Sequence, residues 1–186
     1  MIEKRAIAKW FRYLLPIILI LVIVFAVIGH KQGGADLERQ SRAALKRLLS
    51  CTLQQAEDFD AAAETTQAVM ESMSDSGTGL TQDINKLQDY LIEQFGDYMT
   101  NECIEKLAMD RIFYQSAALA KQFDSDIEAS EMELVQCAGE QERYTFSVEI
   151  KTSAGDSVAA AKGIISMKKD KDKWKASRIT LTMIPS

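Results

Sequence analysis

The residues of this chain that come nearest to an acid–base pair are Asp97, Tyr98, Asp110 and Tyr114, all in the part of the chain predicted to be helical. At helical spacing Asp110 and Tyr114 lie on the same face. A carboxylate close to a phenol can move a proton if both are held in a pocket. However, the chain has 27 acidic residues among 186, so such pairs also arise by chance on solvated surfaces. We therefore predict that the chain is not an enzyme and assign no catalytic residue.

The residues needed for other common chemistries are absent or badly placed. His30 is the only histidine and follows an apolar run, so the body lacks a Ser-His-Asp, Cys-His or zinc constellation. Neither a GxxxxGK[ST] nor a GxGxxG phosphate loop occurs. We predict no metal site and no cofactor.

Three cysteines, Cys51, Cys103 and Cys137, are spaced without a CxxC motif. One disulfide with a free thiol is one interpretation, and Cys103 with Cys137 is then the pair to test. The other interpretation is three partly buried, small apolar residues.

The elements that position any site begin with an apolar run, residues 14–29, which has no charged or hydrogen-bonding side chain. It is predicted to be a single transmembrane helix through which the chain contacts the lipid bilayer. Basic residues in the tail 1–13 favour a cytoplasmic N-terminus and an extracytoplasmic body. A cleaved signal peptide and a buried core helix are the alternatives.

The part of the chain after this run is acidic. The net charge of the whole chain is −5, but four basic residues and one acidic residue precede the run, so 18 basic and 26 acidic residues follow it, a net of −8. Nucleic-acid binding requires basic residues that displace counterions from phosphates. The charge of this part therefore argues against a nucleic-acid partner, and the body is not expected to adhere electrostatically to an anionic bilayer.

Residues 30–79 are predicted to form a stalk, with one long helix from Leu37 to about Met73, and a linker. Asp36 is a candidate cap for this helix, and apolar or small residues recur along it every three or four positions. A second helix is expected from Thr81 to Gly96. A third is expected from about Thr100 to Phe123.

The hydrophobic period changes to two after residue 127. Alternating segments are visible at 131–135, 144–150, 158–167 and 174–183, separated by polar turns. We expect a four-stranded antiparallel sheet, with Trp174 in the core and residues 168–173 (KKDKDK) as a solvated hairpin tip. The predicted fold class is α+β: a transmembrane helix, a long helix, and an extracytoplasmic domain over residues 80–186.

The segments LQDYLIEQFGDYMTNECIEKL, YTFSVEIKT and GIISMKKDKDKWKASRITL resemble the nuclear transport factor 2 superfamily. The resemblance implies a cone-shaped domain, with helices packed in a curved four-stranded antiparallel sheet. It also implies that an Asp and a Tyr inside the cone would be the catalytic groups, as in some members. The layout of short tail, single span and outer domain is similar to the bitopic scaffold subunits of type IV secretion and conjugation machines.

Three functions are compatible with these features. The first is a scaffold or assembly subunit of an envelope complex, whose strand edges and stalk helix contact other membrane-complex subunits or further copies of itself. The second is a membrane-anchored module that binds an apolar or peptide ligand in the cone. The third is an acid–base enzyme, which the sequence disfavours.

Overall fold

A computed structural model describes residues 34–75 and 86–186. Side chains are described for the same residues except 66–75. The predicted tail 1–13 and span 14–29 lie outside these ranges. None of the helices within them is long and apolar enough to cross a membrane.

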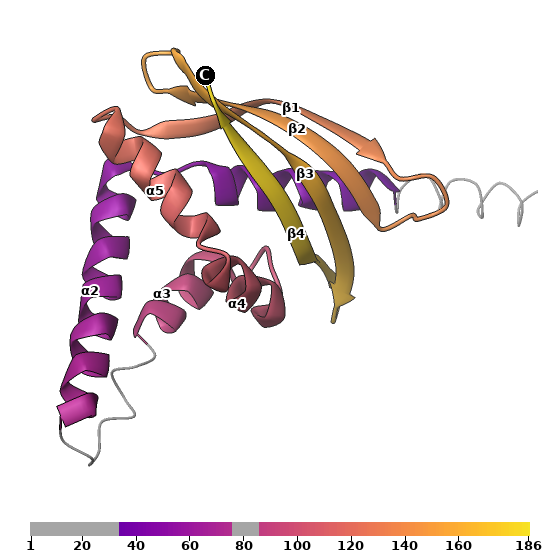
Figure 1. Ribbon diagram of the computed structural model, residues 1–186. Coiled ribbons are helices and arrows are strands. Elements are labelled where there is room, and N and C mark those ends of the chain that lie inside the picture. The colour runs from indigo at the N-terminus through magenta and orange to yellow at the C-terminus, as the bar shows by residue number, and fades with distance from the viewer. Residues whose placement is uncertain (1–33, 76–85) are drawn as a thin grey trace, which may run out of the picture. The chain divides into compact units, whose positions relative to one another are not determined.

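The chain folds as an α+β protein with a four-stranded antiparallel sheet, which confirms the predicted class (Figure 1). A first helix covers residues 34–49, and Glu38–Ser186 forms a compact unit. The later helices are α2 (Leu53–Asp75), α3 (Lys86–Phe95), α4 (Asn101–Met109) and α5 (Ile112–Gln122). The strands are β1 (Ile127–Gln136), β2 (Arg143–Thr152), β3 (Ser157–Asp170) and β4 (Lys173–Pro185).

The sheet has one apolar and one polar face because its side chains alternate. The strands are ordered β1-β2-β3-β4, so each pairs with its neighbours in sequence. On β2, Tyr144, Phe146, Val148 and Ile150 are buried, and the residues between them are half-buried or exposed. We call the apolar face the inner face and the polar face the outer face. The strand positions confirm the predicted change to a period of two.

The prediction of one long stalk helix was wrong, because the chain breaks at residues 50–52. Cys51 exchanges two backbone hydrogen bonds with Ile127 of β1, at 3.1 and 2.9 Å. Thr52 then caps α2: its Oγ1 accepts from the Gln55 N–H, and Gln55 Oε1 accepts from the Thr52 N–H. This reciprocal pair is a capping box, which stabilises a helix start. We call residues 50–52 the corner. Asp36, the predicted cap, lies inside the first helix instead.

The predicted helix from Thr100 to Phe123 was also wrong in its continuity. Thr100 does cap α4, with its side chain accepting from the Cys103 N–H. However, α4 ends at Met109, and Arg111 has a left-handed φ of 56° before α5 begins. A non-glycine residue rarely adopts this conformation, so tertiary packing must stabilise it.

Two predictions about the β3–β4 hairpin have different outcomes. The tip is exposed as expected, although β3 continues to Asp170 and the turn narrows to Lys171 and Asp172. Trp174 is only partly buried and is not a core residue.

Candidate functional site

The structure separates the two residues that helical spacing put on one face. Asp110 lies at the end of α4, where its carboxylate pairs with Lys106 at 2.9 Å. Tyr114 belongs to α5, is 40% exposed, and packs edge-to-face on Phe59 with ring centroids 4.6 Å apart. Arg111 breaks the helix between them. The pair therefore does not form one acid–base face.

The other two candidates, Asp97 and Tyr98, lie beside the β4 edge of the sheet. The Asp97 carboxylate is 83% exposed and lies 3.7 Å from the Lys173 ammonium group. The backbone carbonyl of Tyr98 accepts a hydrogen bond from the Ala176 N–H of β4, at 2.9 Å. These residues thus attach the α3–α4 connection to β4.

Buried polar side chains in the described ranges come from Ser41, Ser116 and Thr152. An acid–base enzyme of this fold would need a carboxylate held in a desolvated site. Among residues 34–65 and 86–186 no Asp or Glu is buried. The same residues contain no group of three or more potential metal ligands.

A small pocket lies among the first helix, the corner, α2, α3 and α5. Its lining includes the aromatic residues Phe59, Tyr90, Phe95 and Phe113. Arg47 closes one side: its Nε donates to the Gln94 carbonyl at 3.1 Å, and its guanidinium lies over the Phe95 ring. The cavity volume is about 30 Å³. Since one water requires roughly 10–15 Å³ on this measure, the pocket accommodates a water or two and no larger ligand.

The cysteines are all free thiols, so the structure contains no Cys103–Cys137 disulfide. Burial raises the pKa of Cys51 to about 11. Burial also raises the pKa of Cys103 to about 12, against a smaller opposing effect of the hydrogen bond from the Ile179 backbone. Both are protonated at neutral pH and behave as small apolar residues, as the second interpretation expects.

The sheet's two edges are each closed along one half. On β1, the Ala129 N–H donates to Ser50 Oγ at 3.0 Å, and the Met132 carbonyl accepts from Arg42 Nη1. Together with the Cys51–Ile127 pair, these contacts occupy the first half of the strand. Within the described ranges, no hydrogen bond reaches the outer edge of residues 133–136. This leaves an open segment at the end of β1.

The β4 edge is closed in the same way. Tyr98 and Thr100 bond the two backbone groups of Ala176 at 2.9 Å each, and the Ile179 N–H reaches the Cys103 thiol. Along the outer edge of residues 180–185, no hydrogen bond is present within the described part of the chain. Leu181 and Met183 are half-buried there, and Ile184 is 46% exposed.

The candidate site is therefore a pair of open edges, residues 133–136 of β1 and 180–185 of β4. Sequence reasoning proposed strand edges as contact surfaces but missed which halves are open. A signal was present on β4, where residues 179–186 carry no charge. On β1 the corner determines which half of the edge is open, and sequence reasoning missed the capping box that marks the corner.

Comparisons with known proteins give no family for this chain. No family model matches it, and no curated protein matches. The solved structures include a solution NMR structure of a de novo designed beta-sheet protein, at 15% identity and a TM-score of 0.27. The match covers 70% of this chain and 92% of that one. A likeness at this score carries no argument about fold or function.

Proposed function

We propose that this protein is a non-catalytic, membrane-anchored assembly subunit whose body makes protein–protein contacts in an envelope complex. The observation that carries the proposal is the open sheet, in which half of each edge strand has no hydrogen-bonded partner among residues 34–75 and 86–186. Unpaired backbone groups on a sheet edge are a template for adding another strand. The apolar run 14–29 supports a location at the membrane, with the N-terminus cytoplasmic and the body outside.

The type of complex follows from resemblance alone. The layout of tail, span and outer domain is similar to the scaffold subunits of type IV secretion and conjugation machines. The nuclear transport factor 2-like pattern likewise supports a cone in which the sheet curves around the helices. Both belong to the proposal, and the expected partners are other membrane-complex subunits or copies of this chain.

The two alternatives have less support. A module that binds an apolar ligand in the cone needs an apolar cavity of several hundred Å³, and the aromatic pocket measures about 30 Å³. A larger hollow of about 520 Å³, beside the β1–β2 turn and β3, is lined mainly by polar and charged residues. An acid–base enzyme needs a desolvated carboxylate, and none is buried in the described part of the chain.

Chemical crosslinking of the full-length protein in its native membrane, followed by extraction in mild detergent, tests the proposal. We expect recovery in a defined complex with other membrane proteins or with further copies. Recovery as a lone monomer would contradict the proposal and favour the ligand-binding module.

A matched pair of variants assigns the contact to the edge. Thr182→Glu places a negative charge on the open edge of β4, whereas Thr145→Glu places it on the central strand β2. Both threonines are exposed on the outer face. We expect Thr182→Glu to lower the yield of the complex and Thr145→Glu to leave it unchanged. Equal yields would contradict a role for this edge.

A further inference from the structure

The two edges of the sheet differ in the features that normally prevent strands from pairing between molecules. Natural edge strands carry charges, bulges or prolines for this purpose. β1 has a bulge between Ser130 and Glu133, with Glu131 at a positive φ of 38°. On β4, residues 179–186 contain no charge, and Pro185 at the end of the strand is the single such feature. The second half of β4 is therefore poorly protected against pairing.

Backbone direction shows which groups point outward. The Thr180 carbonyl lies against Gly163 of β3, and the Ile179 N–H points away, to Cys103. Because direction alternates along a strand, the N–H and C=O of Leu181 also point outward.

The same alternation applies to β1. The Met132 carbonyl points outward to Arg42, whereas the Cys137 N–H points inward to the Arg143 carbonyl. Leu134 is two residues after Met132 on the strand, so its N–H and C=O groups also point outward. Leu134 and Leu181 are thus matched in hydrogen-bonding direction.

The register of the sheet places these two residues in one transverse row. That row reads Leu134, Phe146, Gly163, Leu181. The row beside it reads Glu133, Ser147, Lys162, Thr182. A second copy that continues both rows places its Leu134 opposite Leu181 and its Glu133 opposite Thr182. Apolar side chains then meet on the inner face.

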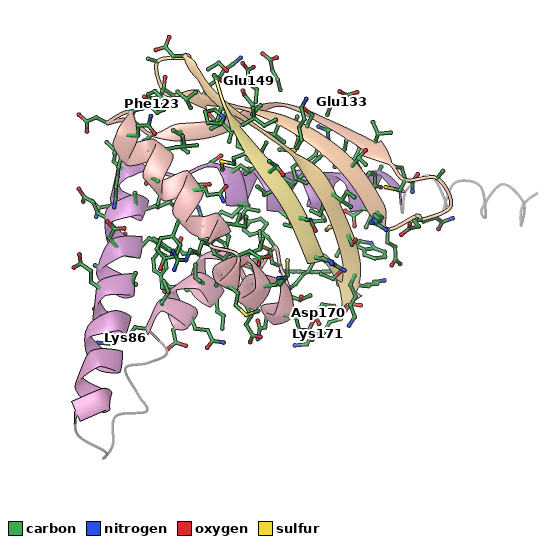
Figure 2. All side chains as sticks on the ribbon, in the orientation of Figure 1. Lys86, Phe123, Glu133, Glu149, Asp170 and Lys171 are labelled. Atoms are coloured by element: carbon green, nitrogen blue, oxygen red, sulfur yellow. The ribbon has the colours of Figure 1, made fainter. Side chains whose placement is uncertain are left out.

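Charge also matches in this register. Glu133 and Lys162 are exposed on the outer face, and neither has an ion pair within the described ranges (Figure 2 labels Glu133). Lys162 would lie two strands from the next copy's Glu133, about 10 Å between backbones. The small Thr182 between them leaves room for the long side chains to meet.

We propose that copies of this chain associate head to tail, the open edge of β4 pairing antiparallel with residues 133–136 of the next copy's β1. A second copy fits the open edge of β4 because the backbone groups of its Leu134 face those of Leu181. Its β1 also continues the transverse rows of the sheet and brings its Glu133 near Lys162. This inference deepens the proposed function and rests on it. The contact is heterologous, since each copy uses two different edges, and it builds a ring or a chain of copies.

Cysteine crosslinking of the full-length protein in its membrane tests the pairing. The background carries Cys137→Ser, which removes the partly exposed thiol. Beside the Leu134–Leu181 hydrogen-bonded pair, residues 133 and 182 form a non-hydrogen-bonded pair with Cα atoms about 4.5 Å apart, close enough for a disulfide. We expect the double variant Glu133→Cys/Thr182→Cys to yield a ladder of disulfide-linked dimers, trimers and larger species after mild oxidation.

The controls separate this arrangement from others. Each single variant is expected to stay monomeric on a non-reducing gel, and Glu133→Cys/Thr180→Cys, which is out of register, to give a much weaker ladder. Absence of the ladder from the double variant, a dimer from Thr182→Cys alone, or an equal ladder from the out-of-register variant would each overturn the proposal. If the native-membrane complex with other proteins is recovered without a ladder, the proposed function stands and the self-pairing fails.

Discussion

Gly163 is the position where an added methyl group should cost the most stability. A Cβ built there would lie 2.0 Å from the Thr180 carbonyl oxygen and 2.9 Å from the Leu181 Cα. Contacts of this kind are normally 3.4 Å or longer, so the first is more than 1 Å too short. Both neighbours are backbone atoms of the paired strand and cannot rotate away. Gly163→Ala therefore forces β3 and β4 apart.

The expected loss follows from overpacking. Forcing atoms into a packed site costs about 1–3 kcal/mol and occasionally more. Removing a glycine recovers roughly 0.4–1 kcal/mol through the unfolded chain. With a backbone clash at the upper end of the range, we expect a net loss of about 2–3 kcal/mol. For a chain of this length that lowers the melting temperature by roughly 4–12 °C.

Thermal unfolding of the full-length protein in mild detergent, followed by near-ultraviolet circular dichroism, measures the loss. Gly139→Ala is the matched control: Gly139 has a φ of +80°, but a Cβ added there would meet no atom within 4 Å, so it tests backbone strain without a clash. We expect Gly139→Ala to lower the free energy of unfolding by about 1 kcal/mol. A loss at Gly163 no larger than at Gly139 would refute the close approach of β3 and β4.

Three further predictions concern the corner, the thiols and the final strand. Thr52→Val removes the side-chain acceptor of the capping box and should cost about 1 kcal/mol in chemical unfolding, whereas no loss would mean that the corner does not need its cap. The pKa values of Cys51 and Cys103 are raised in the folded state. The contribution of these two buried thiols to folding stability is therefore complete below about pH 9, the ordinary pKa of a thiol, and is lost as the pH rises toward 11–12. Stability should therefore fall over that range and fall less in Cys103→Ala, and a thiol reagent at pH 7 should label Cys137 alone; labelling of all three in the folded protein would contradict their burial. Trp174→Ala should cost about 1–2 kcal/mol, because the ring is only partly buried, and a loss above 3 kcal/mol by thermal melting would place it in the core after all.

The sheet was predictable because its pattern is local. In β2 each buried residue alternates with a more exposed one, and polar turns mark the strand ends, so four strands could be placed without knowing their partners. The register could not be predicted, because it depends on a bulge at residues 130–133 and on close packing at Gly163. The open edges follow from that register and from contacts distant in sequence.

The helix breaks show where local patterns fail. Nothing near Arg111 is a glycine or proline, so helical propensity continues through a position that the structure turns left-handed. The corner had a local sign, the T-x-x-Q box of Thr52 and Gln55, but its other half is tertiary: Asp126 Oδ1 accepts from the Leu53 N–H at 2.8 Å. A helical stripe alone cannot show that a strand much later in the chain will interrupt it.

The corner also has a consequence for the proposed assembly. The residues that break the helix, Ser50 and Cys51, are those that close the first half of the β1 edge, together with Arg42 earlier on the first helix. A continuous helix would leave β1 open along its whole length, and pairing could then occur in several registers. Closing one half of each edge leaves open segments, 133–136 on β1 and 180–185 on β4, of which residues 133–135 and 180–182 lie in the same transverse rows. The break that local propensity could not predict therefore reduces the number of registers in which two copies can pair.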